Sequence, residues 1–516
     1  MGCGDSGSGG SGGSGAGASG GSGTGANGNG GNGENGGSGG GSTQGGAGGV
    51  GGTVQQGGMG GATGGGGGGP TTSCTFADGM AIGADCGLFA KTDLGSGGDG
   101  SQANPYGDLG EALARATQLV DTTNAEVNVY VCSNTTDIQG PLELTAGVHL
   151  IGAIDCSDGY SFNAANFHSK AVGSSDNPVI RVTGGALPNS ISFFDLRAVA
   201  GVNPGSSSVG VIANGGTLTM SDCRIETADG LAGTDGVDGM PGAAAGNGAQ
   251  SVSTPPLLVN PPGLGGMSSC GSAGGSGGGK QSIPPPTTKV GAQSGQPGQN
   301  NAGTSGTSCS NGLPGQDHSN DDGQSGQDGD GVGIIDSNGY TGLSGTDGAA
   351  GQNGGGGGGG GYMETAVKFA AGGGGGAGGC GGAGGTHGSF GGSSIAVVSV
   401  GATISLLNTT VLLGNGANGG RRGVAGIASM PGIGGPGEQV GFEIGNIVKA
   451  CDGGPGGGAG DGGFGGAGSG GHSVAVAYQG TAPTLTNTSV TLGAAGTGGT
   501  GGSASNGQAK NTLQFP

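Results

Sequence analysis

The chain has 516 residues, of which 148 are glycine, 21 are proline and 9% are charged, and its net charge is −20. Proline is too scarce for a collagen triple helix, and the acidic balance excludes the basic stripe that a nucleic-acid-binding surface requires. No apolar run approaches the roughly 20 residues of a membrane-spanning helix. Glycine brings no side chain to a core, so we expect a core only where apolar residues gather, in Cys74–Thr227 and in short stretches further on.

Residues 1–72 are glycine, serine, asparagine and threonine with almost nothing apolar, which predicts a disordered tether. Cys3 lies in the opening sequence MGCGDS and, besides chance, has two interpretations. With its long glycine/serine spacer, Cys3 resembles the lipid-carrying cysteine of a bacterial lipoprotein. The same six residues also fit the sequence pattern for N-myristoylation. The spacer favours the lipoprotein, which implies a lipid anchor to the membrane at Cys3 and a location at the bacterial cell envelope, outer membrane or extracellular surface.

The ten cysteines are scattered, with no CxxC and no Cys/His cluster of zinc spacing. This distribution favours an exported protein with disulfides. We predict the pairs Cys74–Cys86 and Cys132–Cys156.

The first structured stretch contains one expected helix. Asp108 followed by Glu111 is typical of a capped helix start. Apolar residues at helical spacing follow at Leu109, Ala112, Leu113 and Ala116. Short strand-like segments come next, at 127–131, 142–154, 179–182 and 191–196. Their separation favours a coil in which each turn buries its apolar face against its neighbours.

One strand-pair pattern occurs three times, with copies that align from Val209, Ile395 and Val474 without a gap. Apolar residues alternate on either side of a glycine turn in each copy, which is the period of a β-strand. The copies lie 186 and 79 positions apart, so we expect the intervening sequence to loop out. One aligned set, Asp222, Asn408 and Asn487, predicts a ladder of side chains or else solvent-facing turns. In the next set, Cys223 aligns with Thr409 and Thr488, which predicts that Cys223 is a packing residue.

Glycine recurs at every third position in 230–242, 339–354 and 493–502. This register suits a helix of three residues per turn, and its glycine faces would allow such helices to pack through their backbones. Residues 251–320 contain proline clusters and no register, so we expect a disordered linker there.

Two resemblances follow from these segments. The run DGSQANPYGDLGEALARA (99–116), followed by a strand and by GVHLIGAID (147–155), resembles the beginning of right-handed parallel β-helices of the pectate-lyase-like type, over roughly residues 88–227. That resemblance implies a helix that caps the coil. The repeats GGAGGT (381–386) and GGAGSG (465–470) resemble those of the mycobacterial PE-PGRS proteins, over roughly residues 354–502. The PE domain of that family has no counterpart here, so its roles do not carry over.

We therefore expect a mostly β protein: a right-handed parallel β-helix with a short N-terminal cap helix and long glycine-rich insertions, either polyglycine-II-like or disordered. The expected domains are a tether at 1–72, coils at 73–230, an insertion at 231–390, a coil at 391–414, an insertion at 415–471, a coil at 472–493 and a glycine-rich tail at 494–516.

Pectate-lyase-like folds often cleave acidic polysaccharides, so the resemblance implies candidates for catalysis. These candidates are Asp195, Arg197, Asp222 and Arg224, in which an arginine would act as the base beside a carboxylate. The later copies replace the second pair with asparagine and threonine, and aromatic platforms for sugars are scarce. An exposed ion pair is the interpretation that we favour.

The acidic loop 317–336 offers oxygen ligands suited to Ca²⁺. The candidate ligands are Asp321, Asp322, Asp328 and Asp330. The loop lacks EF-hand spacing and any repeated calcium motif, so a solvated acidic loop is favoured. We expect no cofactor, with calcium as the alternative.

The favoured function is a non-enzymatic, exported envelope lipoprotein with a structural, adhesive or matrix role and with polysaccharide or cell-surface partners. One alternative is a polysaccharide lyase or hydrolase. Another is an ice- or surface-binding protein that uses the glycine helices or a threonine face formed by Thr484, Thr486 and Thr488.

Overall fold

The computed structural model describes residues 74, 78–133, 137–164, 168–252, 260–281, 288–297, 300–366, 368–441 and 447–516. Cys3 and the tether expected at 1–72 lie outside the described residues. The chain divides into two units, 1–63 and 64–516, and the second one is described here by itself. This second unit is mostly β and contains parallel sheets and one α-helix.

Helix α1 (Leu109–Thr123) begins where the sequence predicts, because the Asp108 side chain accepts a hydrogen bond from the Glu111 N–H at 3.0 Å. It ends at Asn124, which adopts the left-handed conformation. The apolar face of the helix is buried in the same cluster as the inward side chains of the first strands. The buried residues are Leu109, Ala112, Leu113, Ala116 and Val120.

Three parallel sheets form the folded core, and each is named here by a letter. Sheet A contains, in spatial order, β1 (Leu88–Ala90), β2 (Val127–Cys132), β5 (Val148–Asp155), β9 (Asn189–Ser192), β12 (Thr217–Ser221), β21 (Thr403–Leu407) and β26 (Thr484–Thr486), and β6 (Ser161–Phe162) joins β5 antiparallel. Sheet B contains β3 (Ile138–Gln139), β7 (Ser169–Val172), β10 (Phe194–Ala198), β13 (Arg224–Thr227), β22 (Thr410–Leu412) and β27 (Ser489–Thr491). Sheet C contains β4 (Leu142–Thr145), β8 (Ile180–Thr183), β11 (Ser208–Asn214), β20 (Ser394–Val400), β25 (Ser473–Gln479) and β28 (Ala509–Gln514).

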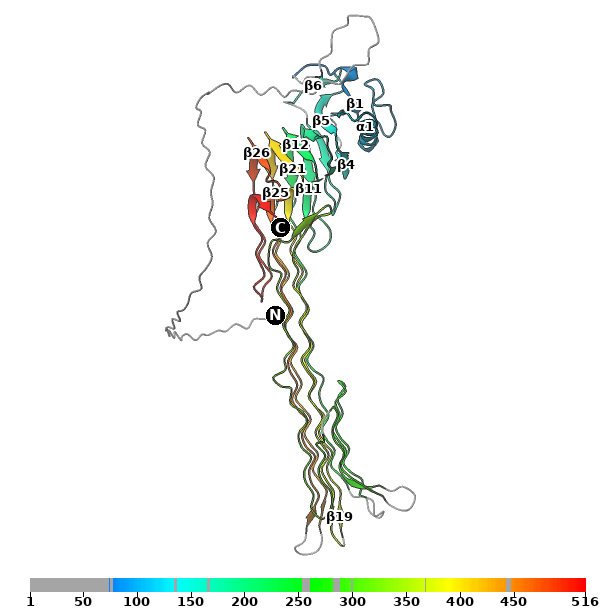
Figure 1. The fold of residues 1–516 in the computed structure, drawn as a ribbon, viewed down its shortest axis with the longest axis vertical. Coiled ribbons are helices and arrows are strands. Elements are labelled where there is room, and N and C mark those ends of the chain that lie inside the picture. The colour runs from blue at the N-terminus through cyan, green and yellow to red at the C-terminus, as the bar shows by residue number, and fades with distance from the viewer. Residues whose placement is uncertain are drawn as a thin grey trace, which may run out of the picture. The chain divides into compact units, whose positions relative to one another are not determined.

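Along the chain the strands visit sheets C, A and B in a fixed cycle, as β11, β12 and β13 do, then β20, β21 and β22, then β25, β26 and β27. This succession is compatible with a β-helix-like fold, in which each cycle is one coil. Val209 lies opposite Ile395, which lies opposite Val474, so the three copies stack in the register that the sequence alignment predicts. Figure 1 shows these strands side by side, with α1 and β26 at opposite ends of the stack.

The turn between sheets A and B carries the predicted ladder of side chains. Asp222, Asn408 and Asn487 all have φ near +50°, a conformation that asparagine and aspartate tolerate better than most residues. Asn487 Nδ2 donates to Asn408 Oδ1, and Asn408 Nδ2 donates to Asp222 Oδ1, both at 3.3 Å. These interactions confirm the ladder.

The following position in each copy points inward, which the sequence predicts for Cys223. The Cys223 thiol is buried and lies 3.4 Å from Ile191 O, while the Thr409 hydroxyl donates to Met220 O at 3.4 Å. Burial raises the pKa of Cys223 to about 12, so its thiol stays protonated at neutral pH.

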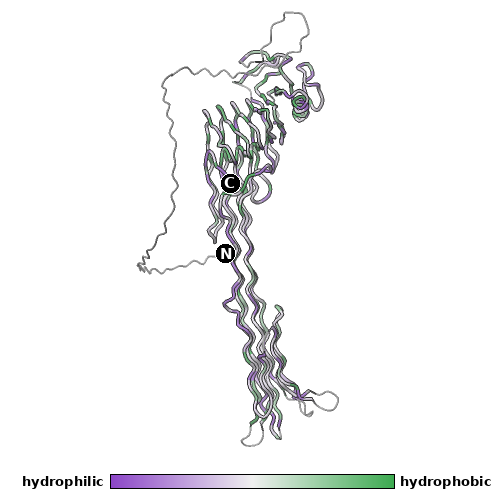
Figure 2. The backbone as a smooth tube through the Cα atoms, viewed as in Figure 1, coloured by the Kyte–Doolittle hydropathy of each residue, from purple (hydrophilic) through white to green (hydrophobic). Residues whose placement is uncertain are grey.

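The segments between coils form a second structure, which we call the glycine bundle. It comprises residues 228–249, 260–281, 293–297, 301–330, 342–361, 371–392, 414–437, 450–472 and 493–508. Figure 1 shows these segments running alongside one another, and Figure 2 shows them mostly pale where the coils are green with apolar residues. Four short antiparallel hairpins belong to the inserted regions: β14 (Gly279–Gln281) with β15 (Thr288–Val290), β16 (Ile334–Asp336) with β17 (Gly339–Thr341), β18 (Met363–Glu364) with β19 (Phe369–Ala370), and β23 (Gln439–Val440) with β24 (Val448–Lys449).

The hydrogen bonds of the bundle run between segments and repeat every three residues. In the buried run Gly354–Gly361, three successive N–H groups donate to three different segments. The pairs are Gly357 with Gly376 O, Gly358 with Leu313 O and Gly359 with Gln293 O, at 2.9–3.0 Å. This is the period of a helix with three residues per turn, surrounded by neighbours on all sides. Glycine is required there because a Cβ at Gly357 would lie 2.2 Å from Gly454 O.

Segments at the edge of the bundle need glycine at only some positions. Gly239 donates its N–H to Val424 O at 2.7 Å, and the Val424 N–H donates to the Asp238 carboxylate at 2.9 Å. The hydrogen bond from the Val424 N–H is the main reason why the pKa of Asp238 is lowered, and a hydrogen bond from the Arg421 side chain is the second. Side chains of aspartate, asparagine, serine and threonine accept hydrogen bonds from edge N–H groups in this way along the bundle. The accepting side chains and the residues whose N–H groups donate to them include Asp235 and Arg421, Asn247 and Ile433, Thr386 and Val237, and Ser389 and Thr234.

The prediction of a disordered linker over residues 251–320 is wrong for the described part of that range. Gly263 and Gly266 donate to Gly372 and Gly375 of the bundle at 3.0 and 2.9 Å. Gly275 and Gly278 continue with the same three-residue spacing after a turn at 268–272. The three-residue spacing of glycine in this range was not recognised, because each segment is too short to reveal a period.

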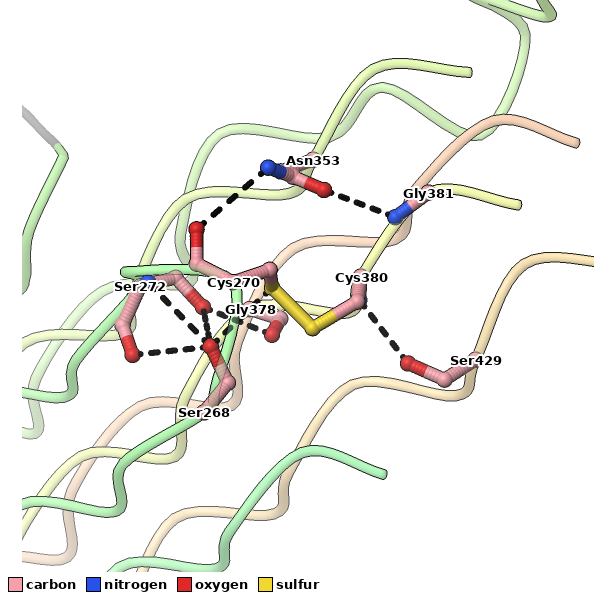
Figure 3. Close-up of a disulfide and its surroundings, with 8 residues drawn as sticks. All are labelled: Ser268, Cys270, Ser272, Asn353, Gly378, Cys380, Gly381 and Ser429. Atoms are coloured by element: carbon pink, nitrogen blue, oxygen red, sulfur yellow. Dashed lines mark hydrogen bonds between the residues drawn. A yellow bond between two sulfur atoms is a disulfide. The ribbon is translucent and has the colours of Figure 1, made fainter. Parts of the chain in front are cut away.

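Four disulfides are present among the described residues. Cys74 is bonded to Cys86 and Cys132 to Cys156, the two pairings that the sequence favours. The remaining two, Cys270–Cys380 and Cys309–Cys451, join different segments of the glycine bundle. Figure 3 shows the first of them, where Ser429 Oγ accepts from the Cys380 N–H at 2.8 Å. The bundle is thus cross-linked covalently as well as by hydrogen bonds.

Candidate functional site

Three of the predicted catalytic residues, Asp195, Arg197 and Arg224, lie on the outer face of sheet B, where register brings charges side by side, and Asp222 lies in the adjoining turn. Asp195 on β10 is opposite Arg224 on β13 and opposite Lys170 on β7. An open groove of about 610 Å³ runs over this face and the adjoining turn. Its polar lining residues are His168, Asp195, Asp222, Arg224, Asn408 and Thr410. Arg197 is not part of this lining and lies opposite Glu226 in the sheet.

The partners of these residues limit what the groove can do. His168 Nδ1 lies 3.0 Å from Asp195 Oδ1, so the carboxylate can orient the imidazole for proton transfer. Asp222 is already bonded within the asparagine ladder, and Arg224 lies 3.5 Å from Glu226. The groove therefore offers one oriented His–Asp pair beside one ion-paired arginine. His168 could not be identified from the sequence, because it precedes β7 and reaches Asp195 only through the pairing of Ser169 with Phe194 one coil later.

The four candidate calcium ligands serve the glycine bundle as hydrogen-bond acceptors. Asp322 accepts from the Asp461 N–H at 2.9 Å, and Asp328 accepts from the Ala467 N–H at 2.7 Å. Asp321 lies 2.5 Å from His318 Nδ1, and Asp330 accepts from Ser505. The structure does not gather the four into one site. No cluster of three or more His, Cys, Asp or Glu side chains fit to hold a metal is found within the described ranges.

Hydroxyl side chains form rows on the outer face of sheet A. Register places Thr219, Ser405 and Thr484 in one row. Ser192 and Ser221 lie next to each other and share a hydrogen bond of 2.8 Å. The threonine face predicted from the sequence is wrong in one member. Thr484 and Thr486 are exposed, whereas the Thr488 hydroxyl points inward and donates to Leu406 O at 3.1 Å.

One exposed apolar feature was not foreseen, a row of four side chains on segment 414–437 of the glycine bundle. Val424, Ile427, Met430 and Ile433 have exposed fractions of 47%, 68%, 88% and 66%. Their spacing of three residues places them along one side of a helix with three residues per turn. The signal in the sequence is an apolar residue at every third position between the glycines. We call this set the apolar row.

The base of the bundle is tied to the coils around a buried histidine. His472 is 1% exposed, its Nε2 donates to Val332 O at 2.8 Å, and its Nδ1 accepts from the Gln508 N–H at 2.9 Å. The rings of Tyr340 and Phe515 pack against it at centroid distances of 5.3 and 5.9 Å. Burial lowers the pKa of His472, which favours the neutral ring that both hydrogen bonds require.

No known protein family, no curated protein and no solved structure matches the chain. Among the described residues, no helix has both the length and the apolar character needed to span a membrane.

Proposed function

We propose that the protein is an exported, non-enzymatic adhesin of the cell envelope, in which right-handed parallel β-helix coils carry a stiff polyglycine-II bundle. The four disulfides support export, because disulfides persist in oxidising compartments. The lipid anchor at Cys3 and the location at the bacterial surface are part of this proposal and rest on the sequence pattern alone.

The observation that carries the adhesive role is the apolar row. Large exposed apolar patches on a soluble protein mark interaction sites, since burying them is favourable by roughly 25 cal/mol per Å². Met430, at 88% exposure, and Ile427, at 68%, project from a backbone that is hydrogen-bonded to its neighbours through Gly426 and Ser429. A rigid row of this kind contacts an apolar surface without an ordering cost for the backbone. Apolar material at the cell surface is the proposed target.

Adsorption to methyl-terminated and hydroxyl-terminated monolayers tests this role. The wild-type protein is expected to adsorb to the methyl surface, and Ile427→Ser/Met430→Ser to adsorb at least about tenfold more weakly, given roughly 1.5–3 kcal/mol for each such side chain. The matched control is Leu313→Ser/Ile334→Ser, which removes two apolar side chains of 58% and 53% exposure outside the row. Equal adsorption of both double variants refutes the role of the row.

Anchoring is tested separately in cells that express the full native reading frame. Labelled fatty acid is expected in the membrane fraction of the wild type and is expected to be lost in Cys3→Ala. Soluble, unlabelled protein in both strains removes the anchor from the proposal but leaves the adsorption result unaffected.

The hydroxyl rows of sheet A favour a second candidate function, binding to ordered water or ice. Side chains in such rows are spaced by about 4.8 Å between strands and about 6.7 Å along them, which presents a regular lattice. Thermal hysteresis of the wild type that disappears in Thr219→Lys/Ser405→Lys supports this function. If the wild type shows no thermal hysteresis, ice binding is excluded.

A further inference from the structure

A pocket of about 360 Å³ lies where the coils meet the base of the glycine bundle, and it shares no residue with the groove on sheet B or with the apolar row. It is lined by two turns on successive coils, residues 176–178 before β8 and 203–207 before β11, by the hairpin β16–β17 and by Phe390 at the end of a bundle segment. We call it the turn pocket. Its volume lies within the roughly 300–1,000 Å³ that small-molecule sites occupy.

Hydrogen bonds hold the walls of the turn pocket in place. Asn203 Nδ2 donates to Asp176 Oδ2 at 3.3 Å and so joins the two turns. Arg181 Nη1 on β8 donates to Ser337 O at 2.9 Å and so fixes the hairpin to sheet C. Glycine is required at Gly201, because a Cβ there would lie 2.2 Å from Asp176 Oδ1. A ligand therefore meets a site that is already formed, with little loop ordering to offset.

The polar groups of the turn pocket are amides, hydroxyls and one carboxylate. They belong to Asp176, Asn177, Asn203, Ser206, Ser207 and Asn338. Among the described residues, Asp176 uses only one of its carboxylate oxygens, and the side-chain amide of Asn338 has no hydrogen-bond partner. Amides and hydroxyls both donate and accept, as the hydroxyl groups of a ligand do. The pocket therefore offers several hydrogen bonds to a ligand that carries hydroxyl groups.

Phe390 and Tyr340 supply aromatic rings to the same pocket, although aromatic residues make up only 3% of the chain. The two rings lie 6.5 Å apart between centroids, at an angle of 88°. Gly205 borders the ring of Phe390, and a Cβ at that position would lie 3.5 Å from Cε2. Since glycine has no side chain to lay against the ring, Phe390 is only half-buried. An apolar face of a ligand can therefore pack against this ring.

The charge of the lining restricts the class of ligand. Asp176 is its one charged side chain, and the lining includes no lysine, arginine or histidine. A ligand that carries a carboxylate, a sulfate or a phosphate would meet a negative charge and no counter-charge. A neutral ligand with hydroxyl groups around an apolar ring face matches both the polar and the aromatic part of the lining. Neutral sugars have this chemistry.

We propose that the turn pocket binds a neutral mono- or disaccharide. The apolar face of the sugar ring packs against Phe390, and its hydroxyl groups form hydrogen bonds with Asp176, Asn203 and Asn338. The site lies on the coils and at the base of the bundle, away from the apolar row. This inference is therefore independent of the adhesive role of that row.

Saturation-transfer difference NMR on the full chain tests the site, with maltose, lactose and di-N-acetylchitobiose as the neutral probes. We expect transfer to at least one of these disaccharides, and weaker binding of digalacturonic acid. Phe390→Ala removes the ring and is expected to bind the same disaccharide about five- to tenfold more weakly. The matched control is Phe464→Ala, which removes a ring of 38% exposure elsewhere on the bundle and is expected to bind like the wild type.

A second pair of variants protects the test against misfolding of Phe390→Ala. Asn338→Ala changes an exposed residue of the hairpin turn and is expected to weaken binding, whereas Asn511→Ala changes an exposed asparagine of β28 and is expected to leave it unchanged. A wild type that binds none of the three neutral disaccharides overturns the proposal. Equal or tighter binding of digalacturonic acid overturns the preference for neutral sugars. Equal binding by pocket and control variants overturns the assignment to the turn pocket.

Discussion

Replacing Gly357 by alanine tests whether the glycine bundle is held by backbone contact. Gly357 lies in the buried run, and a Cβ there would lie 2.2 Å from Gly454 O and 2.3 Å from Pro455 O. Ordinary Cβ contacts lie at 3.4–4 Å. The neighbouring segment would therefore have to move by about 1 Å.

The structure gives the cost of that movement. Gly454 donates to Gly358 O at 2.8 Å and accepts from the Gly376 N–H at 2.9 Å, and a shift of about 1 Å breaks both hydrogen bonds. Each buried group left without a partner costs about 1–3 kcal/mol, so the two bonds together cost several kcal/mol. The reduced freedom of the unfolded chain returns about 0.4–1 kcal/mol, which leaves Gly357→Ala destabilised by about 2–5 kcal/mol.

Hydrogen exchange followed by mass spectrometry measures this effect, and the absence of tryptophan makes fluorescence a poor substitute. Peptides covering 354–361 and 450–460 are expected to exchange faster in Gly357→Ala than in the wild type. Gly291→Ala is the matched control, because Gly291 is exposed and a Cβ there meets nothing within 4 Å. Equal exchange in Gly357→Ala and Gly291→Ala refutes the close-packing argument.

Three further predictions concern the cross-links and the buried polar groups. The double variant Cys270→Ser/Cys380→Ser opens a loop of 110 residues and is expected to lose about 4–5 kcal/mol of stability. Hydrogen exchange is expected to become faster in the glycine bundle and to stay unchanged in the coils. Faster hydrogen exchange in the coils alone contradicts this prediction. Because the pKa of His472 is lowered below its ordinary 6.5 in the fold, the unfolded chain takes up a proton first, so the free energy of unfolding falls as pH drops below about 6.5 and is level above it. His472→Gln is expected to remove that component from melting curves measured across this range, and an identical pH dependence in both proteins rules it out. Cys223→Thr installs the residue that the next copy uses at Thr409, and it is expected to cost less than about 1.5 kcal/mol in denaturant unfolding, with a larger loss arguing against the shared position.

The coils could be predicted because their side chains carry the pattern. In β12, Leu218 and Met220 alternate with threonine and serine at the period of a strand, and a one-residue slip would turn both buried side chains outward. The ladder at Asn408 followed from the same alignment.

The arrangement of the glycine bundle could not be predicted, since a glycine face fits any other glycine face equally well. The pairs Cys270–Cys380 and Cys309–Cys451 depend on which segments become neighbours, so they were inaccessible for the same reason. His168 was missed because its partner Asp195 lies one coil away and the coil length is visible only after the fold is known.

The three-residue period of the bundle makes its length adjustable. The described parts of 228–393 and 414–472 leave the coils, and the chain returns to the next strand of sheet C in register, so the coils do not depend on the size of the excursion. Adding one triplet to each segment at the same level would preserve every donor–acceptor pair and extend the bundle by about 9 Å. Insertions of one or two residues would instead rotate the glycine face away from its neighbour. Homologous chains are therefore expected to differ in reach by whole triplets, with a constant set of coils.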